Sequence, residues 1–271
     1  MAELPNREKL SRMPVVYAPT QTQPVTIKRD IVYTVGAEQT MRLDIYVPDV
    51  APANYTYPPA VLFVAGDRQM AQYCSWGALT AAHGLAAIVC DHREMADYSQ
   101  APLVANDLRQ AVHYVQAHEG ELGIDATRMA VWACSAHTPI GMCLPVREHM
   151  AAIRCLVSYY GPLNLTHLLD ENDPAETVET LEAYSLVRYL NRPEYAIPPM
   201  LIVRPGKDRL RINEAVDYFI AEALRYNAPF ELINYPDGRH AFDIVDDTSD
   251  SRVIIARTLM FLREHLLGVP A

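Results

Sequence analysis

Three side chains that together could carry nucleophilic catalysis each follow a hydrophobic run. Ser135 follows AVWAC, Asp208 follows LIVRPGK, and His240 follows FELINYP after a short turn. A serine hydroxyl is a weak nucleophile at neutral pH, so an imidazole must accept its proton and a carboxylate must orient that imidazole. The three residue types therefore predict attack by Ser135, proton transfer by His240 and orientation of His240 by Asp208.

Each of these residues alone also fits an ordinary structural role. A serine after a strand is commonly a turn or cap residue. Asp208 lies between Lys207 and Arg209, as a solvated carboxylate at a helix N-terminus would. Cys134 is a rival nucleophile because thiols are intrinsically reactive. If Ser135 occupies the apex of a turn, however, Cys134 points into the packing of the sheet as a small hydrophobic side chain.

The elements that must position these residues are short apolar runs alternating with helical segments. The apolar runs lie in AVLFVAG, LTAAHGLAAIVCDHR, RMAVWACSAH, IRCLVSYYG, PMLIVRPGKD and FELINYPDG. Uninterrupted hydrophobic runs of this sort are typical of strands buried on both faces. They predict an α/β fold with a mostly parallel central sheet and helices on both faces. VTIKRDIVYTV and MRLDIYVP alternate around residues 36–38, which predicts an antiparallel N-terminal edge hairpin.

Helical periodicity appears in three segments outside these runs. A helix is expected over residues 104–117, and another over the last apolar segment, ending at Gly268. INEAVDYFIAEALRYNA has an apolar helical face, which consists of Val216, Phe219, Ile220, Ala223 and Leu224. Residues 163–198 are acidic, helical and flanked by prolines. We expect this small insertion to lie over the carboxyl ends of the strands, where ligands bind in open α/β sheets.

Length and composition predict one domain and exclude several functions. With 271 residues, half of them apolar, residues 25–271 fit a single α/β domain, preceded by an irregular N-terminal arm over residues 1–24. A net charge of −10 disfavours nucleic acid and anionic membranes as partners. Five cysteines without paired spacing read as reduced thiols rather than metal ligands. The lack of a leader or membrane span predicts a cytoplasmic protein.

The order serine, acid, histidine and the motifs around it resemble those of α/β-hydrolases. RMAVWACSA is similar to the strand that leads into the nucleophile turn. PMLIVRPGKD resembles the acid loop P-x-L-x-x-x-G-x-x-D, and ELINYPDGRHAF resembles the histidine loop Y-P-x-x-x-H-x-F. The resemblance is to the esterase/lipase and dienelactone-hydrolase-like superfamily. It implies a serine hydrolase that cleaves small to medium carboxylic esters through an acyl-enzyme, without metal or cofactor.

Two departures from the family pattern surround the expected site. The glycines of G-x-S-x-G are replaced by Ala133 and His137. His137 either fits through a local shift of the chain or reaches the site and tunes it.

The second departure is Ala65-Gly66-Asp67-Arg68 where related esterases have H-G-G-G. Main-chain N–H groups of Gly66, Asp67 and Ala136 are the expected oxyanion donors. A carboxylate of Asp67 aimed inward would oppose the oxyanion, unless an ion pair with Arg68 or Arg93 turned it outward.

Other expectations concern the pocket and the rival functions. The candidate pocket residues are Arg68, Tyr73, Trp76, His137, Tyr160 and Phe242, with a core role as the alternative for the aromatics. A small-molecule ester is the expected partner, and homo-oligomer formation is left open. The alternative functions are amide, formamide or C–C bond hydrolysis on the same scaffold, or ligand binding without catalysis.

Overall fold

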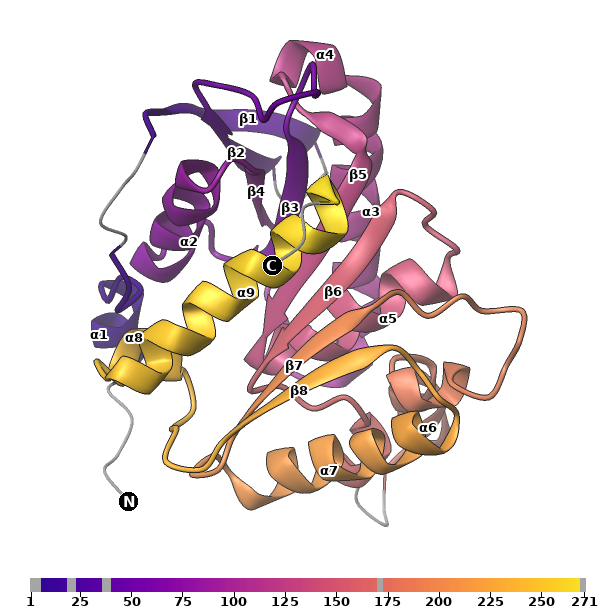
Figure 1. Ribbon diagram of the computed structural model, residues 1–271. Helices are drawn as coiled ribbons and strands as arrows, with labels where there is room; N and C mark the ends of the chain where they lie inside the picture. The colour runs from indigo at the N-terminus through magenta and orange to yellow at the C-terminus, as the bar shows by residue number, and fades with distance from the viewer. Residues whose placement is uncertain (1–5, 19–22, 36–39, 170–172, 269–271) are drawn as a thin grey trace.

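The structure, a computed structural model, describes residues 6–18, 23–35, 40–169 and 173–268. Its strands form one eight-stranded sheet in the order β1-β2-β4-β3-β5-β6-β7-β8 (Figure 1). Strands β3 to β8 run parallel, whereas β2 is antiparallel to both β1 and β4. The predicted α/β-hydrolase fold is confirmed. The strands are β1 (Val25–Val35), β2 (Thr40–Pro48), β3 (Pro59–Gly66), β4 (Ala86–Asp91), β5 (Asp125–Cys134), β6 (Ile153–Tyr159), β7 (Met200–Pro205) and β8 (Phe230–Tyr235).

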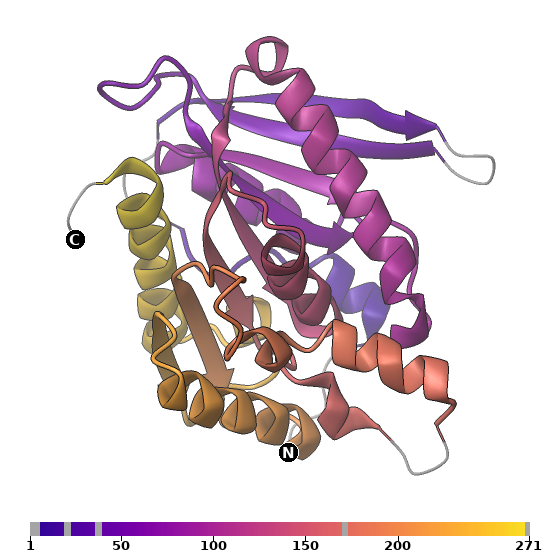
Figure 2. The same ribbon diagram turned by 90° about the vertical axis from the view of Figure 1, so that its right-hand side faces the viewer.

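Helices cover both faces of this sheet (Figure 2). Side chains along a strand point alternately to opposite faces, so an uninterrupted apolar strand needs two apolar layers. In β3, Leu62 and Val64 belong to one core cluster, while Val61 and Phe63 belong to the other. The first cluster is covered by α3 (Ala101–Ala117), α5 (Thr138–Arg147) and α7 (Leu210–Arg225), and the second by α2 (Ala71–Ala82), α8 (Phe242–Val245) and α9 (Ser249–Leu267).

The N-terminal segment differs from the irregular arm expected from the sequence. It contains a short helix, α1 (Arg7–Ser11), and then packs on the domain through Val15, which is 8% exposed. The backbone N–H of Val15 donates to Ser75 Oγ at 2.9 Å, and that of Val16 donates to the Asp243 carbonyl at 2.8 Å. The segment is therefore attached to α2 and α8 of the same chain.

The N-terminal hairpin forms as predicted. β1 pairs with β2 along its length, while residues 36–39 lie outside the described residues.

One residue predicted for the apolar face of α7 is not buried. Val216, Phe219 and Ala223 are buried, but Leu224 is 64% exposed. At about 100° per residue, Leu224 lies roughly 100° from the middle of the buried face.

The acidic insertion and the C-terminal helix follow the sequence pattern. Between β6 and β7 the chain forms η3 (Leu165–Leu168), α6 (Ala175–Ala183) and η4 (Leu186–Tyr189). α6 contacts η1 (Tyr98–Gln100), which follows the carboxyl end of β4. α4 (Glu119–Leu122) precedes β5, and α9 ends at Leu267 with Gly268 as its cap, whose φ of 66° suits a glycine. In the described part of the chain, no helix combines the length and the apolar character that crossing a membrane requires.

Candidate active site

Ser135 sits on a sharp turn between β5 and α5. It begins the short 3-10 turn η2 (Ser135–His137), and its φ of 52° lies in the left-handed region. A residue with a Cβ occupies that region at a cost of about 1–3 kcal/mol, and such strain persists only where the surroundings impose it. The turn presents the hydroxyl beyond the carboxyl end of the strand, as a nucleophile on this kind of fold requires.

A chain of hydrogen bonds joins the three predicted residues. Ser135 Oγ lies 2.9 Å from His240 Nε2, and His240 Nδ1 lies 2.8 Å from Asp208 Oδ2. The Asp208 side chain is fully buried, and that of His240 is 11% exposed. The imidazole can therefore hold a proton on Nδ1 against the carboxylate and leave Nε2 free to accept the serine proton.

The acid and histidine loops are held together by main-chain bonds. The N–H of Gly206 donates to the Tyr235 carbonyl at 2.7 Å, and the N–H of Lys207 donates to the Gly238 carbonyl at 2.9 Å. A Cβ at Gly206 would lie 2.4 Å from the Pro236 carbonyl oxygen, so only glycine allows this approach. These bonds explain why Asp208 and His240 meet although they lie on separate strand-to-helix connections.

Glycines at other positions provide the close packing that G-x-S-x-G would supply. A Cβ at Gly141 would lie 2.6 Å from the Ala133 Cβ, and a Cβ at Gly161 would lie 2.5 Å from the Ser135 carbonyl oxygen. Because Gly141 and Gly161 make these close approaches, position 137 does not require a small side chain. The His137 ring lies 4.6 Å from that of His92 in an edge-to-face contact, and burial lowers the pKa of both imidazoles. The His137 ring thus packs against His92, at the turn that carries Ser135.

The segments expected to supply oxyanion donors are neighbours. β3, which ends at Gly66, contacts the turn that contains Ala136. The exposed Asp67 carboxylate accepts a hydrogen bond from the N–H of Gln69 at 2.9 Å. Asp67 is thus held by a turn of its own loop, while Arg68, one of the two arginines considered as its partner, pairs with other aspartates. The N–H groups of Gly66, Asp67 and Ala136 stay our proposed donors.

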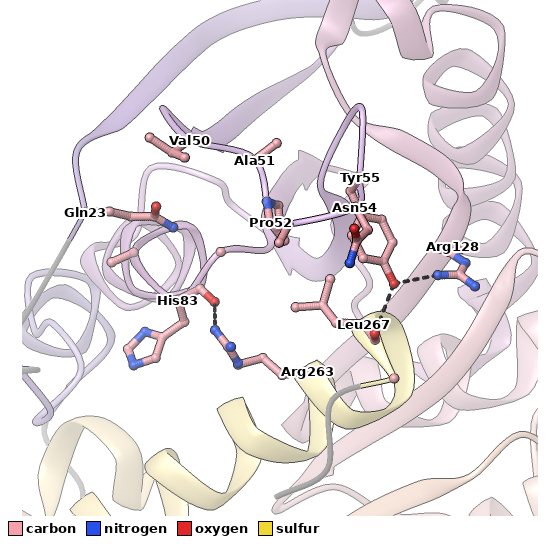
Figure 3. Close-up of a pocket in the computed structure, with 14 residues that line it drawn as sticks. Gln23, Val50, Ala51, Pro52, Asn54, Tyr55, His83, Arg128, Arg263 and Leu267 are labelled. Carbon is pink, nitrogen blue, oxygen red and sulfur yellow. Dashed lines mark hydrogen bonds between the residues drawn. The ribbon is translucent and has the colours of Figure 1, made fainter.

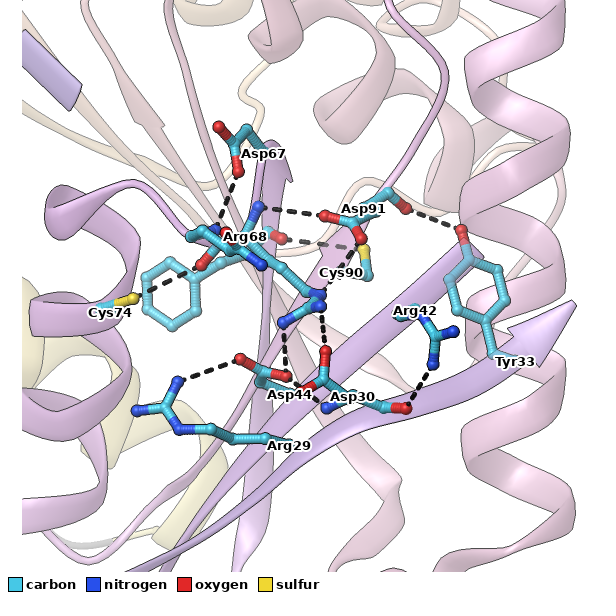
Figure 4. Close-up of polar contacts among 12 residues, drawn as sticks. Arg29, Asp30, Tyr33, Arg42, Asp44, Asp67, Arg68, Cys74, Cys90 and Asp91 are labelled. Atoms are coloured by element: carbon cyan, nitrogen blue, oxygen red, sulfur yellow. Dashed lines mark hydrogen bonds and ion pairs between the residues drawn. The ribbon is translucent and has the colours of Figure 1, made fainter. Parts of the chain in front are cut away.

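Arg68 does not line a pocket, because its guanidinium is occupied on every side (Figure 4). It is 4% exposed and pairs with Asp30, with Asp44 at 2.9 Å and with Asp91 at 3.1 Å. Its backbone N–H also donates to Asp91, and Arg29 adds a second pair to Asp44. Asp30 reaches Arg68 from a bulge in β1, where its φ is 58°. Arg68 therefore anchors the loop after β3 to three strands.

Removing this anchor should reduce stability strongly. In Arg68→Met, Asp44, which is 1% exposed, loses its buried partner and keeps only the longer contact with the half-exposed Arg29. Breaking a buried ion pair by removing one partner costs about 3–5 kcal/mol, so the free energy of unfolding in urea should fall by about that amount. Arg252→Met is the matched control, since Arg252 forms an exposed pair with Asp247 and should change stability by less than about 1 kcal/mol. Equal losses in the two variants would refute the role given to Arg68.

The aromatic pocket candidates lie in the core instead of lining an open pocket. Trp76 and Phe242 are 0% exposed, Tyr160 is 2% and Tyr73 is 3%. They pack with Trp132 and Tyr159 in a cluster of tilted and edge-to-face rings. Trp132 and Tyr159, the strand residues of this cluster, point to the face covered by α2 and α9, and the four candidates pack against them there.

Two polar residues near the triad, Asp243 and Gln72, were not predicted from the sequence. Asp243 is fully buried three residues after His240, and Gln72 of α2 contacts it. The available signal was a single carboxylate inside the apolar run AFDIV. A charge in such a run is either exposed or held by buried donors.

A pocket at the other end of the sheet shows no comparable chemistry (Figure 3). It has a volume of about 770 Å³ and lies at the amino ends of β3 and β4, away from Ser135. Its two arginines are engaged by carbonyls at helix ends, Arg263 with that of His83 and Arg128 with that of Leu266. Over the described residues, no three histidine, cysteine, aspartate or glutamate side chains gather in a way that could hold a metal ion.

Comparison with known proteins relates the chain to esterases. The sequence model of the BD-FAE family matches residues 43–215. The comparison with curated proteins found no match.

Solved structures of esterases share the fold. A truncated carbohydrate esterase from gut microbiota superposes with a TM-score of 0.70 at 16% identity, covering 93% of this chain and 99% of the other. Esterase 2 of Thermogutta terrifontis, phosphonylated by cyclosarin, gives 0.67 at 19% identity, with 92% and 95% covered. Esterase B of Lactobacillus rhamnosis gives 0.65 at 13% identity, with 90% of both chains covered.

Proposed function

The chain belongs to the BD-FAE family, a family of α/β-hydrolases, and from this premise we propose that it is a serine hydrolase of small to medium carboxylic esters. The observation that carries the proposal is the continuous hydrogen-bond chain from Ser135 Oγ through His240 to Asp208. Esterase structures with the same fold add support.

In the first half-reaction, Ser135 Oγ attacks the carbonyl carbon of the ester while its proton passes to His240 Nε2. The carbonyl oxygen becomes an oxyanion, to which the N–H of Ala136 and an N–H of Gly66 or Asp67 donate. The intermediate collapses by breaking the bond to the alcohol oxygen, which takes the proton from Nε2. Asp208 stabilises the positive imidazolium throughout without taking its proton.

In the second half-reaction, water replaces the alcohol. His240 Nε2 accepts a proton from the water as it attacks the acyl carbon, and the same N–H donors receive the second oxyanion. Collapse returns the proton to Ser135 Oγ and releases the carboxylic acid. The triad geometry is equally suited to amides, so the preference for esters rests on the esterase structures that share the fold.

A fluorophosphonate probe tests the proposal against ligand binding without catalysis. Such probes transfer a phosphonyl group to an activated serine and release fluoride. We expect stoichiometric labelling of the wild-type protein, mapped to Ser135 by peptide mass spectrometry, and no labelling of Ser135→Ala. A wild-type protein that stays unlabelled, or is labelled at another residue, would exclude the proposed nucleophile.

A further inference from the structure

The carboxylate of Asp243 is buried beneath the triad and contacts neutral donors. It is 0% exposed. Its Oδ2 accepts from Trp76 Nε1 and from Gln72 Nε2, both at 2.9 Å, and its Oδ1 accepts from the hydroxyl of Tyr160 at 2.8 Å. Gln72 Nε2 also donates to the Tyr160 hydroxyl at 2.7 Å. In each of these contacts with Asp243, the partner has a proton to give.

Counting protons in this network makes Asp243 an anion. The indole N–H of Trp76 and the Nε2 amino group of Gln72 can only donate, and the Tyr160 hydroxyl, which already accepts from Gln72 Nε2, donates its own proton to Asp243. A protonated carboxyl would have to compete with one of these donors. Burial raises the pKa of Asp243, and the donated hydrogen bonds oppose that rise. Donation to both oxygens therefore favours the charged form.

Tyr160 connects this carboxylate to the catalytic imidazole. Its ring centroid lies 4.8 Å from that of His240, and its hydroxyl binds Asp243. Its φ of 38° is in the left-handed region, which a tyrosine adopts only when its surroundings enforce it. The backbone N–H of Tyr160 donates to the Val203 carbonyl at 3.2 Å, and its hydroxyl is bound by Gln72 and Asp243, so both ends of the residue are held.

We propose that Asp243 is a positioning residue of the triad, whose buried carboxylate holds the Tyr160 ring against His240 and adds a second negative charge behind the imidazolium. The inference rests on the proposed function and extends it. Asp208 contacts the imidazole directly, whereas Asp243 acts through Tyr160 and through space. A low-dielectric interior strengthens such a charge interaction relative to water.

The carboxylates to consider are the buried Asp208 and Asp243 and, on the loop after β3, the exposed Asp67, whose charge is screened by solvent. His240 faces Ser135, Asp208 and Tyr160. Arg239 in the same loop is paired with Asp246. The groups packed near Asp243 are weak acids whose pKa is raised by burial, so they stay neutral. They are Tyr73 of α2, Cys134 of β5, and Tyr159 and Tyr160 at the end of β6.

Asp243→Asn tests the charge with little change of shape. Losing a negative charge disfavours the imidazolium, so the midpoint of the acid limb of kcat/KM should move down by about one pH unit. The plateau of kcat/KM should fall about tenfold, because a shift of one pH unit and a tenfold change in rate correspond to the same free energy. The NMR titration of the His240 imidazole, assigned with His240→Gln, should move in the same direction. An unchanged titration in a folded Asp243→Asn would overturn the inference.

Two further variants separate positioning from loss of stability. Tyr160→Phe keeps the ring but removes the bond to Asp243, and should lower kcat/KM about tenfold through misplacement of His240. Thr258→Val is the control: it removes the buried bond between Thr258 and Tyr159 without changing charge, and should leave the acid limb in place. An equal shift in Thr258→Val would contradict the inference.

The NMR titration needs no turnover, so it also separates this inference from the proposed function. A wild-type protein that hydrolyses no ester, yet shows the His240 shift in Asp243→Asn, would reject the function and keep the electrostatic link. Hydrolysis by Ser135 with no shift in the titration would reject the link and keep the function.

Discussion

Ser135→Ala is expected to lower kcat for short p-nitrophenyl esters by about 10⁴-fold or more, because it removes the proposed nucleophile of the acyl-enzyme. The alanine Cβ fits the space of the serine Cβ, so the far-ultraviolet spectrum and the free energy of unfolding should stay close to those of the wild type. Initial rates at saturating ester measure the loss.

The neighbouring thiol provides the matched control for this prediction. Cys134 is buried, and burial raises the pKa of its thiol to about 12, so it is a poor source of thiolate at neutral pH. Cys134→Ala should therefore keep activity within a few fold. Near-wild-type hydrolysis by Ser135→Ala, or loss of activity in Cys134→Ala alone, would move the nucleophile to position 134.

Asp208→Asn should reduce kcat by about 10⁴-fold while the protein stays folded. The carboxylate accepts from Nδ1 of His240, and an asparagine can present its NH₂ group to that nitrogen instead. The imidazole would then carry its proton on Nε2, where it can no longer accept the proton of Ser135. Steady-state kinetics at pH 7 test this directly.

A second carboxylate close by serves as the control for Asp208. Asp237 is paired with Lys207 on the surface, and such exposed pairs contribute little. Asp237→Asn should change kcat less than threefold. A loss in this variant as large as that in Asp208→Asn would show that net charge near the loop matters more than contact with Nδ1.

The order of the triad could be read from the sequence because each residue follows an apolar run. Parallel strands end at one edge of the sheet, so the sequence places Ser135, Asp208 and His240 at the same edge. The hydrogen bonds among them and the closeness of their loops depend on Gly206 and on main-chain pairs. The sequence carries no local sign of those pairs.

The supports of the site were harder to predict because their partners are distant in the sequence. Arg68 is 24 residues from Asp44 and 38 from Asp30, and Gln72 is 171 residues from Asp243. Polar residues in loops look solvated when read one at a time. Arg68 and Asp243 become structural only when three or more segments fold over them.

The left-handed backbone at Ser135 is needed for catalysis but lowers the stability of the fold. A glycine at this position would relax the chain and leave no hydroxyl, whereas every residue able to attack an ester must bear the conformational penalty. The tight contacts of Gly141 and Gly161 around the turn hold the kink in place. The φ angle of Ser135 is thus a point at which the protein gives up some stability for activity.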